Sequence, residues 1–247
     1  TGVKVENTAE AGKPVNYKVS LDDKVKVGNV TIDGKDSKGE ITGLTNTTID
    51  GTDFAKKGRA ATEEQLKQAF SERTRLVAVT HISNVLGCKT PIKRITELAK
   101  ECGAVVVLDA SQSVPHIPVD VQSLDVDFLA FSGHKLMAPF GIGVLYGKES
   151  LLEKMPPFLT GGEMISSVTR EGATYAKLPH KFEAGTVNAA GAAGLAAAIR
   201  YVEKIGFDTI MAKEEALTKR AMEGLKKVPH LHILGDEAPE NHTGIVA

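Results

Sequence analysis

The feature that most constrains the fold is an alternation of apolar, strand-like runs with helical patterns from residue 75 onward. Residues 104–108 form an apolar run with no polar position, which predicts a strand buried on both faces. Just before it, an amphipathic pattern that opens with Pro91 predicts a helix over residues 91–101. Strands that alternate with helices in this way form layered α/β domains. We therefore predict an α/β domain with a mostly parallel sheet flanked by helices.

The same alternation continues along the chain. Further buried strands are predicted at residues 76–80 and 128–131, and another strand at residues 143–146. Long helices are predicted at residues 189–205 and 207–228, separated at Gly206.

The first part of the chain has a different character. It is rich in Thr, Asn, Asp, Lys and Gly, and the short alternations at residues 25–27 and 30–32 predict β-strands joined by turns. Its apolar residues are too few to close an independent core, so it needs another surface or other copies of itself. We predict a β-rich appendage over residues 1–70 that ends in a short helix, and an α/β domain over residues 71–247.

Charge and cysteine content narrow the class of function. A net charge of -1 and a pI of about 6.6 give no broad attraction to nucleic acid or to an anionic membrane. No apolar run approaches the roughly 20 residues that span a bilayer. The two cysteines, Cys88 and Cys102, form neither a disulfide framework nor a zinc motif. We expect a cytoplasmic protein with a small-molecule partner and no metal.

A polar motif, Ser132-Gly133-His134-Lys135, follows the strand predicted at residues 128–131. A lysine amine in a partly desolvated site forms a Schiff base with an aldehyde cofactor. Ser132 and His134 are short polar neighbours suited to a phosphate group. The motif alone also fits a surface lysine in a loop, and the preceding strand at residues 104–108 decides against that interpretation.

That strand delivers Asp109 at its carboxyl end, where open parallel sheets bind their ligands. A carboxylate that pairs with a protonated pyridine nitrogen keeps the ring an electron sink. A solitary aspartate after a strand is more often a helix cap. Together, Asp109 and Lys135 favour pyridoxal 5'-phosphate (PLP) as the cofactor.

Two other segments are predicted to reach the same edge of the sheet. Asn84 follows the strand at residues 76–80 and can donate to a phenolic oxygen or a substrate carboxylate. His81 in the same segment is more readily explained as a structural histidine. Thr186 lies in the loop that opens the alanine-rich helix, where it either offers a hydroxyl to phosphate or belongs to an ordinary helix start.

In this order, the four segments resemble the class V aminotransferase fold group, and most closely the cysteine desulfurase and selenocysteine lyase family. This implies the large-domain fold of PLP-dependent transferases of the aspartate aminotransferase type. The resemblance also implies a set of side chains around the cofactor. These are Lys135 as the Schiff-base lysine, Asp109 at the ring nitrogen, Gln112 beside the phenolic oxygen, Asn84 near cofactor and substrate, Ser132 and His134 at the phosphate, and Thr186 at the phosphate of the other subunit.

The family resemblance implies removal of sulfur from cysteine, or selenium from selenocysteine, to give alanine. It implies a homodimer, an amino-acid substrate and a sulfur-acceptor protein. In the family, further segments supply the arginine for the substrate carboxylate and the cysteine that accepts sulfur. Cys88 and Cys102 lie in the wrong segments for that role. We therefore expect impaired turnover by this chain alone.

Residues 39–48 and 58–66 resemble the neck of trimeric autotransporter adhesins, which joins β-rich head segments to a coiled-coil stalk. Thr62 and Gln65 have capping-box spacing, which also fits an ordinary capped helix after a polar loop. The alternative functions are therefore a fragment of a trimeric adhesin or a non-catalytic chimeric protein.

Overall fold

The computed structural model describes residues 3–7, 17–21, 24–27, 30–33, 40–42, 63–236 and 238–247, with side chains from residue 66 onward. The chain divides into two compact units. One comprises Thr1–Ala55 and Ala60–Gln65, and the other comprises Lys56–Arg59 and Leu66–Ala247. The functional boundary predicted at residue 70 stays a prediction.

The first unit contains short antiparallel strands, as predicted for a β-rich segment. They are β1 (Val3–Asn7), β2 (Tyr17–Leu21), β3 (Lys24–Val27), β4 (Val30–Asp33) and β5 (Glu40–Thr42). β1 pairs with β2, and β3, β4 and β5 form a separate three-stranded sheet. The helix α1 (Glu63–Gln68) follows. Thr62 and most of the neck-like segment lie outside the described residues.

The second unit is built on a four-stranded sheet in the order β6-β7-β8-β9. The strands are β6 (Leu76–Thr80), β7 (Val105–Asp109), β8 (Phe128–Ser132) and β9 (Gly143–Gly147). β6, β7 and β8 run parallel, and β9 is antiparallel to β8. The prediction of an α/β fold with a mostly parallel sheet is confirmed.

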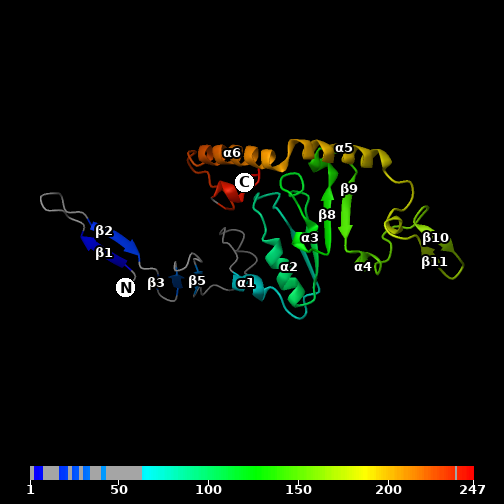
Figure 1. The fold of residues 1–247 in the computed structure, drawn as a ribbon, viewed down its shortest axis with the longest axis horizontal. Coiled ribbons are helices and arrows are strands. Elements are labelled where there is room, and N and C mark those ends of the chain that lie inside the picture. The colour runs from blue at the N-terminus through cyan, green and yellow to red at the C-terminus, as the bar shows by residue number, and fades with distance from the viewer. Residues whose placement is uncertain are drawn as a thin grey trace. The chain divides into compact units, whose positions relative to one another are not determined.

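Helices and short turns surround this sheet. They are α2 (Ile92–Glu101), α3 (Val121–Leu124), η2 (Gly133–Leu136), α4 (Glu149–Leu152), η3 (His180–Phe182), α5 (Ala189–Ile205), α6 (Phe207–Leu225) and η4 (Pro239–Asn241). Figure 1 shows α5 and α6 end to end, across the end of the sheet where β8 stops. The hairpin of β10 (Ile165–Val168) and β11 (Ala173–Tyr175) projects beyond β9. Among the described residues, no helix is long and apolar enough to cross a bilayer.

The core of this unit lies between α2 and the sheet. Ile92 and Ala99 of α2 pack with Val106 and Leu108 of β7, and all four side chains are at most 2% exposed. This arrangement follows from the apolar stripe of α2 and the continuous apolar run of β7. Because β7 is central and buried, its last residue, Asp109, has a defined position at the sheet edge.

Two sequence-based predictions are wrong in detail. The strand at residues 76–80 was expected to be buried, yet Leu76 is 59% exposed, because β6 is an edge strand of the described sheet. The helix expected to reach residue 228 ends at Leu225, and tighter turns follow it. Pro229 explains the early end, because a proline ring clashes with the helical carbonyl four residues before it, here that of Leu225, and proline has no N–H to donate.

Candidate functional site

The carboxyl ends of the three parallel strands meet at one edge of the sheet. Thr80 at the end of β6 pairs in register with Asp109 of β7, and Asp109 pairs with Ala130 of β8. The segments that follow these strands carry the predicted residues Asn84, Gln112 and Lys135. Parallel strands bring these segments together at the end of the sheet where ligands of such folds bind.

A hollow of about 510 Å³ lies at this edge. Asp109, Ser111 and Ser132 provide its polar lining. Ala130, Phe131, Gly141, Ile142 and Gly143 complete the wall. The volume falls in the usual range for small-molecule sites, about 300–1,000 Å³. Of the predicted site residues, Asp109 and Ser132 line this hollow, whereas Asn84, Gln112, His134, Lys135 and Thr186 do not.

Asp109 is exposed at the end of β7, and one of its carboxylate oxygens accepts a hydrogen bond from a neighbouring backbone N–H. Its Oδ1 accepts a hydrogen bond from the Ser111 backbone N–H at 2.9 Å. In the part of the chain that the structure describes, Oδ2 has no hydrogen-bond partner. The bond to Ser111 fixes the carboxylate, so that Oδ2 is available to a cationic N–H group of a ligand.

Lys135 lies on η2, the single turn that directly follows β8. Gly133 opens this turn at a place where a Cβ atom would lie 3.0 Å from the Ile142 carbonyl oxygen, so a side chain does not fit there without displacement. Leu136 is 3% exposed and packs with Leu195 and Val202 of α5. Lys135 itself is half-buried, and its amine makes no hydrogen bond or ion pair with the described residues. The turn is therefore fixed while the amine stays available.

The two polar residues beside Lys135 contact each other. Ser132 Oγ and His134 Nδ1 lie 2.7 Å apart, and the His134 ring stacks on Phe140 at a centroid distance of 5.6 Å. These contacts orient the imidazole, and its Nε2 atom stays available to a ligand. Phe140, which is 86% exposed, was not predicted as part of the site. Its position in the turn-rich segment after Lys135 was the only sequence signal.

Asn84 and Gln112 occupy compact turns beyond β6 and β7. Asn84 is exposed in a turn in which the Gly87 N–H donates to the Ser83 carbonyl at 2.9 Å. Gln112 is half-buried in a turn closed by bonds from the Ser113 and Val114 N–H groups to Ala110. Both side chains are at the correct edge of the sheet, but neither lines the hollow.

Thr186 is exposed in the loop before α5. Next to it, Asn188 accepts from the Gly191 N–H at 2.9 Å and donates to the Gly141 carbonyl at 3.1 Å. Asn188 is thus the helix cap that an ordinary helix start requires. It also attaches the Thr186 loop to Gly141, which borders the hollow.

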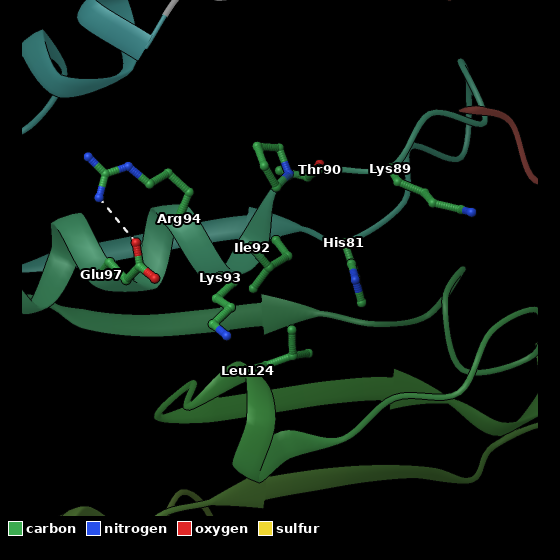
Figure 2. A pocket seen from close by; sticks show the side chains of 9 residues that line it. His81, Lys89, Thr90, Ile92, Lys93, Arg94, Glu97 and Leu124 are labelled. Atoms are coloured by element: carbon green, nitrogen blue, oxygen red, sulfur yellow. Dashed lines mark hydrogen bonds and ion pairs between the residues drawn. The ribbon is translucent and has the colours of Figure 1, made fainter. Parts of the chain in front are cut away.

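A second hollow lies at the start of α2, away from Lys135. Figure 2 shows His81, Ile92 and Leu124 around it, with the Arg94 side chain directed to Glu97 at 3.1 Å. His81 is 8% exposed, and its Nδ1 atom has no partner among the described residues. Burial lowers the pKa of His81, and the charge of Lys89 lowers it further. This hollow is mainly apolar, so we assign it no chemistry.

The Asp109 carboxylate lies at the end of β7, and the Lys135 amine lies in the turn after the neighbouring strand β8. A Schiff-base lysine and a carboxylate at the ring nitrogen are the groups with which proteins hold pyridoxal phosphate. The sequence model described as "Aminotransferase class-V" matches residues 39–247. The chain belongs to this family, in which pyridoxal phosphate is the cofactor.

Relatives within the family are cysteine desulfurases. A probable cysteine desulfurase of Streptomyces coelicolor is 48% identical over 182 residues, which cover 74% of this chain and 44% of that protein. The apo structure of a cysteine desulfurase from Thermococcus onnurineus is 40% identical, with a TM-score of 0.72 and coverage of 76% of this chain and 47% of that one. The chain thus spans less than half the length of these relatives.

A second solved structure is that of a C-DES mutant with glycine covalently linked to its PLP cofactor. It is 26% identical, has a TM-score of 0.66, and covers 74% of this chain and 49% of that chain. These comparisons do not support the adhesin alternative.

Proposed function

We propose that this chain binds pyridoxal 5'-phosphate at Lys135 and acts as a cysteine desulfurase or selenocysteine lyase. The observation that carries the proposal is the placement of Asp109 at the end of β7 and of Lys135 in the turn that follows the neighbouring strand β8. Asp109 and Ser132, the last residue of β8, line one hollow. Relatives named as cysteine desulfurases at 48% identity support the choice of reaction.

The described residues fit the cofactor. A pyridoxal ring needs an anion at its protonated nitrogen, and Asp109 Oδ2 has no other partner among the described residues. The aldehyde needs an available amine, which Lys135 provides. The phosphate needs donors at the opposite end, and Ser132 Oγ with the His134 ring supplies them.

Each residue then has a defined role. With the cofactor bound, Asp109 would hold the proton on the ring nitrogen, and Lys135 would hold the cofactor's aldehyde and carry protons at its Nζ atom. Gln112 and Asn84 donate from their amide groups to the phenolic oxygen and the substrate. Bound in this way, the cofactor supplies an electron sink for bond cleavage at the substrate.

The proposed substrate is cysteine or selenocysteine, which loses sulfur or selenium and leaves alanine. The proposed partner is a protein that accepts the sulfur. This partner would connect the activity with iron–sulfur cluster assembly. We also propose a homodimer in which Thr186 reaches the phosphate of the other subunit. Because Cys88 and Cys102 are both free, the proposal includes a reducing, cytoplasmic location.

The test is a borohydride-trapping experiment on the purified chain with added pyridoxal phosphate. We expect one reduced adduct, located by peptide mapping on Lys135 and absent from Lys135→Ala. The matched control is Lys89→Ala, which removes an exposed lysine that also follows a strand. An adduct that persists in Lys135→Ala would show that another lysine holds the cofactor.

The reaction itself is tested separately. Chain with cofactor and an added dithiol is supplied with cysteine or with selenocysteine, and alanine is measured together with sulfide or selenide. The dithiol takes up the removed sulfur or selenium atom and reduces it to sulfide or selenide, and is itself oxidised to the disulfide. Alanine formation that depends on Lys135 supports the proposed activity. Transamination products without sulfide would instead indicate another class V reaction.

A further inference from the structure

The turns that carry Gln112 and Asn84 both form hydrogen bonds with one part of the chain that comes much later in the sequence. This part comprises α6 and the segment that follows it, up to Thr243. None of its described residues lines the hollow beside Asp109.

The first contact holds the turn of Gln112. His116 Nδ1 donates to Glu214 Oε1 of α6 at 2.5 Å, and the two side chains are 23% and 24% exposed. Exclusion of most water from this pair strengthens its hydrogen bond relative to a surface pair. The pair joins residues that are 98 positions apart in the sequence.

Bonds within the turn transmit this restraint to Gln112. The Ala110 N–H donates to the Ala130 carbonyl of β8 at 2.9 Å, which anchors the beginning of the turn. The His116 N–H donates to the Ser113 carbonyl at 2.9 Å, which connects its end to the residue after Gln112. The sheet therefore fixes one side of the turn, and Glu214 fixes the other.

The second contact holds the turn of Asn84. The Thr243 N–H donates to the Gly87 carbonyl at 3.0 Å, and its Oγ1 donates to the same oxygen at 3.3 Å. Cys88 also forms an antiparallel bridge with His242. Thr243 is 3% exposed. Its hydroxyl is thus committed to the turn, whereas Asn84 itself is exposed and available to a ligand.

The two contacts belong to one packed structure. A Cβ atom at Gly244 would lie 3.7 Å from the Glu214 carboxyl carbon, so the chain next to Thr243 runs past the group that holds His116. Residues of α6 also pack against η4. Any displacement of α6 therefore affects both turns.

We propose that Glu214 and Thr243 are positioning residues that hold Gln112 and Asn84 in place for the cofactor and substrate. This inference rests on the proposed function, because it assigns a purpose to the turns of that site. Groups that bind a cofactor need to be held within about 0.5 Å of the productive geometry, and neighbours that fix the turns provide this. Neither residue touches the reacting atoms.

The experiment compares Glu214→Ala, Glu214→Gln and Thr243→Val in the full chain. Hydrogen exchange is measured by mass spectrometry without cofactor. We expect Glu214→Ala to speed exchange in the peptide containing residues 110–117, and Thr243→Val to do so in residues 83–88. Glu214→Gln keeps an acceptor for His116 and should restore much of the protection. Glu215→Ala, an exposed neighbour on α6, is the matched control.

Trapping at Lys135 then separates positioning from a merely structural role. For Glu214→Ala we expect the pyridoxal phosphate concentration that gives half-maximal adduct to rise roughly threefold to tenfold, a change typical of losing one hydrogen bond. The maximal adduct should be unchanged. A structural defect would instead lower the maximum, since part of the protein would be unfolded.

The possible results distinguish failure of the positioning role from failure of the proposed cofactor binding at Lys135. If the unsubstituted chain forms the Lys135 adduct and the variants match it in exchange and in half-maximal concentration, the positioning role is wrong and the proposed function stands. Faster exchange with no change in half-maximal concentration also overturns the positioning role. If the unsubstituted chain forms no adduct at Lys135, both proposals are wrong.

Discussion

Asp109 at the end of β7 is the register partner of Ala130 on β8, the strand that leads directly into the turn of Lys135. The pairing places a carboxylate and an amine on neighbouring strand ends without any contact between them. The Ser111 N–H binds the Asp109 carboxylate, and Leu136 anchors the turn of Lys135 in the apolar cluster with α5. The sheet and its core thus position Asp109 and Lys135, and no bond joins these two residues.

Replacing Asp109 with alanine should weaken cofactor binding. The carboxylate would no longer meet the ring nitrogen, and a hydrogen bond to a charged group contributes about 1.5–3 kcal/mol. We therefore expect a loss of roughly 10- to 100-fold in affinity, measured by titration of pyridoxal phosphate absorbance. Asp120→Ala is the control, because Asp120 only caps α3. Equal affinity of Asp109→Ala and the unsubstituted chain would contradict the assigned role.

The core beneath Asp109 should be sensitive to truncation. Leu108 is fully buried, and Leu108→Ala removes its side chain next to the site. We expect the free energy of unfolding, measured in urea, to fall by about 2–5 kcal/mol. Leu159 is 61% exposed, and Leu159→Ala should change it by less than about 0.5 kcal/mol. A small effect of Leu108→Ala would mean that β7 is not the centre of the core.

Asp127 should stabilise the opposite end of the sheet. Its Oδ2 accepts from the Val106 N–H at 2.8 Å, and its Oδ1 accepts from Lys148 at 2.9 Å. Asp127→Ala leaves the Val106 N–H without its partner, and we expect a loss of about 1–3 kcal/mol in urea unfolding. Glu97→Ala breaks only the exposed pair with Arg94 and should cost at most about 1 kcal/mol. Similar losses in both variants would refute the special role of Asp127.

His81 should make stability depend on pH. Its pKa is lowered from 6.5 in the folded chain, first by burial and then by Lys89. At pH values near 6.5 and below, the unfolded chain therefore binds more protons than the folded chain. The contribution of neutral His81 to the free energy of unfolding is complete above about pH 6.5, and it is lost as the pH falls through the lowered pKa of the folded state. His81→Leu should remove this part of the dependence.

The measurement is urea unfolding on both sides of about pH 6.5. His230→Gln, at an exposed position, is the control and should leave the slope of stability against pH unchanged. An unchanged slope in His81→Leu would show that another group causes the acid sensitivity.

Local patterns predicted most elements of the second unit. The strand at residues 76–80 and the helix at residues 189–205 coincide with β6 and α5. Apolar periodicity, Pro91 and Gly206 act within a few residues of their own position, so they can be interpreted without knowledge of the fold. Burial of β6 was predicted wrongly, because exposure depends on whether a further strand pairs with it.

The sequence predicted where along the fold the candidate site residues lie. Asp109 and Lys135 each follow an apolar run, which indicates a strand end by itself. Their assigned roles stay predictions until the trapping experiment is done. The stacking of His134 on Phe140 was missed, since no sequence pattern specifies which ring an exposed phenylalanine will contact.

The sequence by itself determined the order of strands and helices, the polar residues at the strand ends and the resemblance to PLP enzymes, because these depend on local pattern and spacing. Tertiary structure alone decided that Glu214 meets His116 and that Thr243 meets Gly87. Such contacts join residues far apart in the chain, and they form only when the packing of α6 against the rest of the unit fixes both partners in space.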